Sequence, residues 1–280
     1  PFPLIVLPII LGIFYGLMQL CNTIFWSLNI SRIFFFSTSW SLFEILRSTI
    51  LTGFPWNLIA YSWSWSISFM QSLSLFGVFG LGIVTIFCSA GIFSFSIKKI
   101  NMVLSIFSIS IIVFLYFFGH NRVLNYEDVY LNDDKIRLVS TNFNQEEKWS
   151  EEAFEKMISL GSNKIPTIFP ETSFGIRKTH KENWISGFIR SNGKDFYNSV
   201  KYNNQIYDKR KLVPFGEFIP FHTLLNKMGL KIFLPFESFS TGKTNNNFDN
   251  FIVPLICYEG IFSYIVRENI QSTSGLMVNI

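Results

Sequence analysis

The first 120 residues of this 280-residue chain contain very little charge. Nearly all charged side chains follow Asn121, and those before it are Arg32, Glu44, Arg47, Lys98 and Lys99. Across the whole chain, 49% of the residues are hydrophobic and 33 are Phe. A segment so poor in charge and so rich in apolar side chains excludes an ordinary soluble domain. We therefore predict a transmembrane helical domain over residues 1–120 and a water-facing domain over residues 121–280.

Histidine and cysteine are scarce, with three of each in the chain. His120, His180 and His222 are isolated and share no ligand spacing, so no metal site is predicted, and no residue pattern suggests an organic cofactor. The net charge is only +4 and the basic residues form no stripe, which argues against nucleic acid as a partner. The second half contains a single cysteine, Cys257, which has no disulfide partner there. It is either a reactive thiol or a small buried apolar side chain.

Four stretches are predicted to span the membrane, because a spanning helix needs about 20 mostly apolar residues. The second stretch contains Glu44 and Arg47, which lie three residues apart on one helix face and could pair. Charges at membrane depth usually face protein or water rather than lipid. The four stretches are residues 2–25, 33–51, 70–95 and 102–118.

The few basic residues of the first half predict its orientation. Arg32 and the pair Lys98–Lys99 fall in loops on the same side of the predicted bundle, and the positive-inside rule makes that side cytoplasmic. The loop of residues 52–66, which is rich in Trp and Tyr, then faces outward at the membrane interface. Everything after Asn121 is predicted to be extracytoplasmic.

The second half alternates between strand-like and helix-like segments, which predicts an α/β layered domain. Ser150 is a predicted N-cap for a helix that runs to Gly161, with acidic residues in its first turn. Asn192-Gly193 is a predicted hairpin turn. The expected strands are residues 136–143, 165–169, 184–190, 195–200, 251–257 and 275–280, and a further helix is expected over residues 261–270.

Three chemically versatile residues follow apolar strands, the position at which α/β enzymes place working side chains. They are Glu171, Lys209 and Cys257. A thiol attacks a carbonyl as its thiolate, so a carboxylate could accept the thiol proton and later return it. An ammonium could stabilise the anionic intermediate. Taken alone, each of these side chains is better explained by a structural or surface role, and the case for chemistry depends on the motifs around them.

Four motifs around these residues, in their order along the chain, resemble those of the apolipoprotein N-acyltransferases. This family is a membrane-embedded branch of the nitrilase superfamily, also called the carbon–nitrogen hydrolases. The motifs are SLFEILRSTILTGFPWNLIAYSW (41–63), FPETS (169–173), YDKRKLVPFGEFIP (207–220) and ICYE (256–259).

The resemblance implies a role for each matching residue. It implies Glu171 as general base, Lys209 as the residue that stabilises the intermediate, and Cys257 as nucleophile. Glu217 lies at the family's spacing from the lysine and would orient it. Arg210 and Lys211 do not match the lysine's position and are expected at the surface.

The resemblance also implies supporting residues. Tyr258 and Glu259 follow the nucleophile as in the family, and Trp149 matches a tryptophan linked to substrate engagement. Without the resemblance, Trp149 would be a packing residue just before a helix. Relative to the family, the chain is expected to be truncated at both ends and to have a short segment between Glu171 and Trp184.

The resemblance implies an α-helical transmembrane bundle plus a nitrilase-like αββα sandwich, incomplete at its C-terminus. It implies transfer of a fatty acyl chain from a phospholipid, through a cysteine thioester, to the α-amine of the diacylglyceryl-cysteine of apolipoproteins. The expected location is the bacterial inner membrane, as a multi-pass protein with its catalytic domain on the periplasmic side. The alternatives are a membrane-tethered amidase of the same superfamily and an inactive, truncated homologue.

Overall fold

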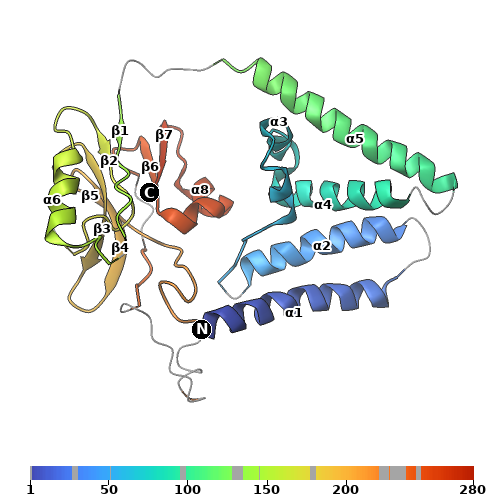
Figure 1. The fold of residues 1–280 in the computed structure, drawn as a ribbon, viewed down its shortest axis with the longest axis horizontal. Helices are drawn as coiled ribbons and strands as arrows, with labels where there is room; N and C mark the ends of the chain where they lie inside the picture. Colours follow the sequence, from blue (N-terminus) through green and yellow to red (C-terminus); the bar gives the residue numbers. More distant parts are fainter. Residues whose placement is uncertain are drawn as a thin grey trace. The chain divides into compact units, whose positions relative to one another are not determined.

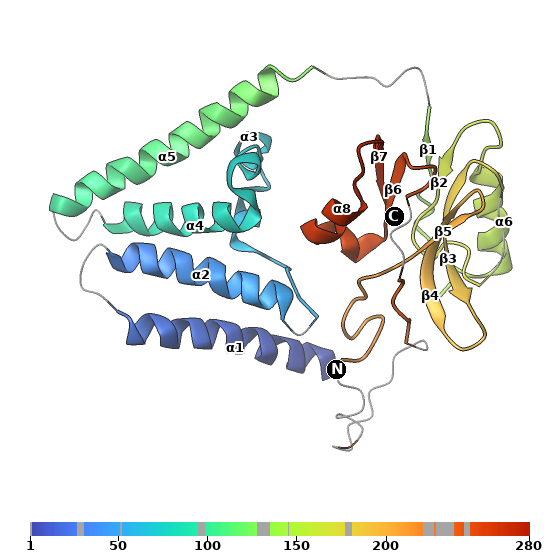
Figure 2. The same ribbon diagram turned by 180° about the vertical axis from the view of Figure 1, so that it is seen from behind.

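The computed structural model describes residues 2–26, 31–50, 52–94, 99–127, 135–144, 146–176, 181–220, 227, 238–243 and 247–280. The chain divides into two compact units, Pro1–Val129 and Tyr130–Ile280. Figures 1 and 2 show their elements, and each unit is described by itself. Lys98, His180, His222 and part of the segment between Glu171 and Trp184 lie outside the described residues.

The first unit is helical. Its long helices pack in the order α1, α2, α4 and α5, and the short α3 packs on α5. Arg32, expected in a loop, lies in the first turn of α2. The elements are α1 (Phe2–Ile24), α2 (Ser31–Thr49), η1 (Ile59–Trp63), α3 (Ile67–Met70), α4 (Leu73–Phe93) and α5 (Lys99–Leu124).

Three helices are long and apolar enough to cross a membrane, in the part of the chain that the structure describes: Leu7–Ile24, Leu73–Phe93 and Met102–Leu124. They correspond to the first, third and fourth predicted spans. The second predicted span forms a helix, α2, but is not among the three. Its charged residues and many hydroxyl side chains lower its hydropathy. The four-span arrangement therefore stays a prediction.

The two charges in α2 bond to the loop that follows the helix rather than to each other. Glu44 is 2% exposed and Arg47 4% exposed. Glu44 Oε1 accepts a hydrogen bond from the backbone N–H of Ile59 at 2.8 Å. Arg47 Nη1 donates to the carbonyl oxygens of Phe54 at 3.0 Å and Trp56 at 2.7 Å. These charged side chains therefore satisfy backbone groups of a loop that has no regular hydrogen-bond ladder of its own.

The second unit is an α/β unit, as predicted. The predicted N-cap is confirmed, because Ser150 Oγ accepts a hydrogen bond from Ala153 N at 3.1 Å. The elements are β1 (Arg137–Leu138), α6 (Glu151–Leu160), β2 (Thr167–Ile168), β3 (Trp184–Ser191), β4 (Phe196–Tyr202), β5 (Gln205–Asp208), β6 (Ile252–Leu255), η3 (Cys257–Ile261), α8 (Ser263–Asn269) and β7 (Leu276–Asn279).

The strands form a five-stranded sheet in the order β1-β2-β3-β4-β5 and a two-stranded sheet of β6 and β7. β1, β2 and β3 are parallel, whereas β3, β4 and β5 are joined as antiparallel hairpins. The predicted Asn192-Gly193 turn joins β3 to β4, and Gly193 has the positive φ of 92° that this turn favours. Several predicted strands are longer than the observed ones. Of the strand predicted over residues 136–143, only Arg137–Leu138 forms β1. The strand predicted over residues 251–257 is observed as β6, which ends at Leu255, and Cys257 begins η3.

Two apolar clusters define the layers of this unit. One joins Met157 of α6 to Trp184 and Phe188 of β3, so α6 covers one face of the five-stranded sheet. The other joins Val200 of β4 to Val278 of β7, so the two sheets pack face to face. Figures 1 and 2 show α8 beyond β6 and β7, giving the layer order α6, large sheet, small sheet, α8.

Candidate active site

The three predicted catalytic residues each follow a strand of the second unit. Glu171 lies in a turn that begins three residues after β2. Lys209 comes directly after β5. Cys257 begins η3 after β6. Each of the three segments therefore begins close to the end of a strand.

A cluster of charged and amide side chains gathers around the buried Lys209. Its ammonium nitrogen lies 3.0 Å from Glu171 Oε1 and 2.8 Å from Glu217 Oε1. The amide nitrogen of Asn198, from β4, lies 2.6 Å and 2.8 Å from the same two oxygens. The second oxygen of Glu217 accepts from the backbone N–H of Val213 at 2.8 Å. The structure thus brings Glu171, Lys209 and Glu217 together.

Lys209 remains charged although it is almost completely buried. Its side chain is 1% exposed. Burial alone lowers the pKa of the Lys209 ammonium, but the carboxylates of Glu171 and Glu217 outweigh it, so the net shift is upward. Breaking either contact would leave a buried charge partly uncompensated.

Cys257 lies beside this cluster and is exposed. Desolvation by its surroundings raises the pKa of the Cys257 thiol, and the negative charge of Glu171, a hydrogen bond with that carboxylate and the charge of Glu217 raise it further. Lys209 opposes the shift. The thiol is therefore protonated at neutral pH, and Glu171 is the neighbouring carboxylate that could accept its proton.

The backbone at Cys257 is strained. Its φ of 48° falls in the left-handed region, which residues with a Cβ rarely adopt. Its N–H donates to the carbonyl of Ile280 at 2.7 Å, and its own carbonyl accepts from Asn279 Nδ2 at 3.2 Å. These contacts with β7 and the residue after it hold the sharp turn that carries the sulfur.

The turn that carries Glu171 is held by two neighbouring side chains from the loop before α6. Lys148 Nζ donates to the Glu171 carbonyl and to Thr172 Oγ1, both at 2.8 Å. Trp149 Nε1 donates to the Thr172 carbonyl at 2.9 Å. Burial lowers the pKa of Lys148, and the nearby charge of Glu171 opposes that shift.

Gly187 of β3 supports the same turn from the sheet. A Cβ on Gly187 would lie 2.5 Å from the carbonyl oxygen of Pro170 and 2.8 Å from the Cα of Glu171. No side chain fits there without moving the turn. Neither Lys148 nor Gly187 was predicted to belong to the site, because neither belongs to a motif with a recognisable chemical pattern.

Glu259 is fully buried and links the lysine segment to the cysteine turn. It accepts hydrogen bonds from the backbone N–H groups of Arg210 at 2.7 Å, Lys211 at 3.2 Å and Ile256 at 2.9 Å, and from the hydroxyl of Tyr207 at 3.0 Å. Burial nevertheless raises the pKa of its carboxyl group above the ordinary value. Glu259 therefore ties the end of β5 to the start of η3.

Two expectations for this region need correction or refinement. Arg210 and Lys211, expected at the surface, are half-buried, because their backbone N–H groups reach inward to Glu259. Tyr258 is 6% exposed and packs edge-on against Phe262, with ring centroids 5.0 Å apart. It thus lies in the core next to the exposed cysteine.

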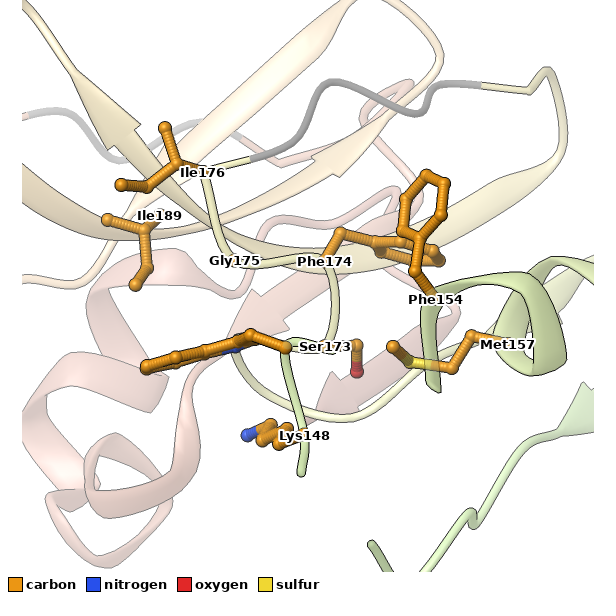
Figure 3. A pocket seen from close by; sticks show the side chains of 9 residues that line it. Lys148, Phe154, Met157, Ser173, Phe174, Gly175, Ile176 and Ile189 are labelled. Atoms are coloured by element: carbon orange, nitrogen blue, oxygen red, sulfur yellow. The ribbon is translucent and has the colours of Figure 1, made fainter. Parts of the chain in front are cut away.

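An apolar pocket of about 350 Å³ lies beside the Glu171 turn (Figure 3). Trp149 forms part of its wall, and Lys148 is one of its few polar lining residues. A mostly apolar lining with a few polar groups is typical of pockets that bind small ligands. The lining residues are Lys148, Trp149, Phe154, Met157, Ser173, Phe174, Gly175, Ile176 and Ile189.

The fold and the candidate site together define a class of protein that joins apolar helices of membrane-spanning length to an α/β unit with a thiol site. In this α/β unit, the contacts of Lys209 with Glu171 lie beside the exposed thiol of Cys257. Among the described residues there is no group of three His, Cys, Asp or Glu side chains arranged to hold a metal ion.

Comparison with known proteins shows similarity to the apolipoprotein N-acyltransferases. Residues 1–91 match the apolipoprotein N-acyltransferase N-terminal domain. The whole chain is 33% identical to the apolipoprotein N-acyltransferase of Rickettsia bellii and covers 63% of that protein. It is 32% identical, over 96% of its length, to the protein of the same name from Rickettsia prowazekii, and covers 61% of it. A further relative of this name, from Allorhizobium ampelinum, is 28% identical over 98% of the chain.

The resemblance to the apolipoprotein N-acyltransferases is therefore confirmed. The chain spans 61–63% of the length of its two Rickettsia relatives. Its apolar helices and its relatives indicate a bacterial membrane protein.

Proposed function

We propose that this chain belongs to an N-acyltransferase that moves a fatty acyl chain from a phospholipid, through a thioester on Cys257, to the α-amine of the diacylglyceryl-cysteine of apolipoproteins. The observation that carries the proposal is the gathering of Glu171, Lys209 and Glu217 beside the Cys257 thiol. The name shared by its relatives supports the same reaction.

In the first half-reaction, Glu171 accepts the thiol proton while the sulfur attacks the ester carbonyl carbon of the phospholipid. The tetrahedral intermediate carries a negative oxygen. Two N–H groups of Lys209 are engaged by Glu171 and Glu217, so a third is left to donate to this oxygen. The C–O bond to the lysophospholipid then breaks, and the departing oxygen takes the proton from Glu171. A thioester remains on Cys257.

In the second half-reaction, the α-amine of the acceptor attacks the thioester carbonyl and gives its proton to Glu171. The C–S bond breaks, an amide forms, and the proton on Glu171 returns to the sulfur. The cycle needs no external oxidant, metal or cofactor. The backbone N–H of Cys257 donates to Ile280 and is not assigned to the oxyanion.

The lipid character of both substrates fits two features of the chain. The apolar pocket beside Glu171 offers a place for hydrocarbon, and the Trp149 ring in its wall is the proposed contact with substrate. The membrane helices would keep the enzyme where its lipid-anchored substrates lie.

We further propose the domain boundaries and location that the family implies. Residues 1–120 form the transmembrane domain with about four spans, and residues 121–280 form an extracytoplasmic, nitrilase-like αββα domain at the bacterial inner membrane. The layer order of the second unit and the positions of the basic residues support this arrangement.

The test is acyl-enzyme formation in membranes that contain the full-length protein and a phospholipid with a labelled acyl chain. Wild-type protein is expected to acquire a label that hydroxylamine removes, as a thioester requires. Cys257→Ala should acquire none, whereas Cys88→Ala, which changes a buried thiol in α4, should label normally. A hydroxylamine-sensitive label on Cys257→Ala would refute the assignment of the nucleophile.

The same geometry also supports a second candidate, a membrane-tethered amidase that cleaves a C–N bond through Cys257. Release of ammonia from a small amide, without transfer to a lipopeptide amine, would favour it. Wild-type protein that fails to label with any acyl donor would favour the third reading, a non-catalytic homologue.

A further inference from the structure

The residue that completes the charged cluster is Asn198, which sequence reasoning did not select. It lies on β4 and is 2% exposed. Its Nδ2 contacts Glu171 Oε1 and Glu217 Oε1, the same two oxygens that Lys209 Nζ contacts. Each of the two nitrogens, Asn198 Nδ2 and Lys209 Nζ, thus contacts both carboxylate oxygens, so the four contacts form a ring.

The orientation of the Asn198 amide follows from its neighbours. An amide nitrogen carries two hydrogens, one for each carboxylate, whereas the reversed orientation would place an oxygen against two carboxylate oxygens. The consequence is that Asn198 Oδ1 is buried and has no hydrogen-bond partner among the described residues. An unsatisfied buried acceptor disfavours folding, so the two hydrogen bonds that Nδ2 donates to the carboxylates are what hold the amide in this orientation.

The backbone of Asn198 is also tied to the site. Its carbonyl accepts from the backbone N–H of Lys209 at 2.8 Å. This backbone hydrogen bond keeps the two residues side by side, and the bonds that the amide and the ammonium make to Glu171 both fall on Oε1.

We propose that Asn198 is a positioning residue that, together with Lys209, fixes Glu171 by its Oε1 and turns Oε2 toward the Cys257 thiol as the atom that accepts the proton. The role in acyl transfer rests on the proposed function. The role in holding the Glu171 carboxylate at the thiol does not rest on it, because this role can be tested by the alkylation rate of the Cys257 thiol alone.

The test is a double-mutant cycle on the rate at which iodoacetamide alkylates Cys257 at pH 8 in the full-length protein, with Cys21 and Cys88 changed to Ser in every variant. The negative charge of Glu171 holds back thiolate formation, so Glu171→Gln alone should speed alkylation by about threefold or more. In an Asn198→Ala background the carboxylate is no longer held at the sulfur, and Glu171→Gln should change the rate by less than about twofold.

Asn204→Ala is the matched control, because this asparagine lies in the exposed turn between β4 and β5. In that background Glu171→Gln should keep its full effect. Additive behaviour of Asn198→Ala and Glu171→Gln would overturn the proposal, and so would a Glu171→Gln change without effect in the otherwise unaltered protein.

Asn198→Asp provides a second variant if Asn198→Ala does not fold. An ionised Asp repels both carboxylates, whereas a protonated Asp donates one hydrogen bond. Acyl-enzyme formation should therefore be about 100-fold slower than wild type at pH 7 and recover partly as the pH is lowered. A loss that is the same at every pH would contradict the positioning role. Wild-type protein that forms no acyl-enzyme would sink the proposed function but leave the alkylation cycle decisive for Asn198.

Discussion

Among the described residues, one set of acidic and basic side chains consists of Glu44 and Arg47 and another surrounds Lys209, and the two sets are bonded in different ways. In the first, helical unit, Glu44 and Arg47 each bond to backbone groups of the following loop. In the α/β unit, Glu171 and Glu217 bond to Lys209 directly. The charged side chains of the first set form hydrogen bonds with backbone groups of a loop, whereas those of the second set gather around the Lys209 ammonium.

Both sets leave buried polar atoms without a hydrogen-bond partner among the described residues, and they differ in what lies beside them. Glu44 Oε2, Arg47 Nε and Arg47 Nη2 are buried and have no hydrogen-bond partner among the described residues. Around Lys209, the atom without a partner is Asn198 Oδ1, whereas Glu171 Oε1 and both oxygens of Glu217 accept hydrogen bonds. Here the charges of Glu171 and Lys209 also act on the Cys257 thiol. We infer that the Glu44 and Arg47 contacts are structural and that the Lys209 cluster is chemical. Changes in the first should therefore lower stability, and changes in the second should lower rate.

Glu171→Gln tests the chemical set most strongly. The neutral amide cannot accept the thiol proton, so acyl-enzyme formation should fall by about 10²- to 10⁴-fold. Alkylation of the same thiol should become faster, because the charge of Glu171 raises the pKa of Cys257. The measurements are label incorporation and iodoacetamide alkylation over a series of pH values.

The sign of that pH dependence is fixed by the neighbours of the thiol. In wild-type protein, alkylation should rise only above the ordinary cysteine pKa of about 8.5. Glu171→Gln should move the rise to lower pH, and Lys209→Met should move it to higher pH, since Lys209 lowers the pKa of Cys257. Movement of both variants in one direction would contradict this electrostatic account.

Gly187→Ala should have the next largest effect. The added Cβ meets the Glu171 turn at 2.5–2.8 Å and must displace it. A displacement of about 1 Å at a reacting group can cost about 100-fold in rate. The measurement is acyl-enzyme formation in protein whose thermal melt still shows a folded state. A wild-type rate in folded Gly187→Ala would mean that this turn does not set the position of the base.

Lys148→Met should have a smaller effect on the same turn. It removes the charged donor to the Glu171 carbonyl and Thr172 Oγ1, and the loss of such hydrogen bonds should slow acyl-enzyme formation about tenfold. The expected change is in kcat rather than KM, with partial recovery in Lys148→Arg. Lys164→Met, at an exposed position, is the control. An unchanged kcat in Lys148→Met would assign the contact to stability alone.

Arg47→Met should have the smallest effect on the chemistry. It leaves the carbonyls of Phe54 and Trp56 without their donor, which should cost about 1–3 kcal/mol in stability for each unsatisfied group. The thermal midpoint in detergent should drop, while the folded fraction should still form acyl-enzyme at the wild-type rate. Arg122→Met, on the exposed end of α5, is the control. A slow rate in folded Arg47→Met would break the distinction between the two sets.

Much of the fold could be predicted because its signals are local. The apolar stretches of α1, α4 and α5, the Ser150 cap and the Asn192-Gly193 turn are each encoded within a few neighbouring residues. The strand ends were less accurate. β1 keeps two residues, because strand length depends on the partner strand rather than on the apolar run itself.

The candidate site was predictable where motifs mark it and not elsewhere. Glu171, Lys209 and Cys257 stand in recognisable motifs. Asn198 and Lys148 are an asparagine in a strand and one lysine among many, and only their contacts distinguish them. A polar residue in the middle of an otherwise half-buried strand was the one available signal for Asn198.

The sequence by itself determined that one half is built for a membrane and the other for an α/β layer, because hydropathy and periodicity act over short stretches of chain. It also supplied a carboxylate, an amine and a thiol. Only the tertiary structure decided that Glu171 and Lys209, 38 residues apart, touch, and that Tyr207 reaches Glu259 across 52 residues. Such contacts depend on how strands pair and sheets stack, which is a property of the whole folded unit.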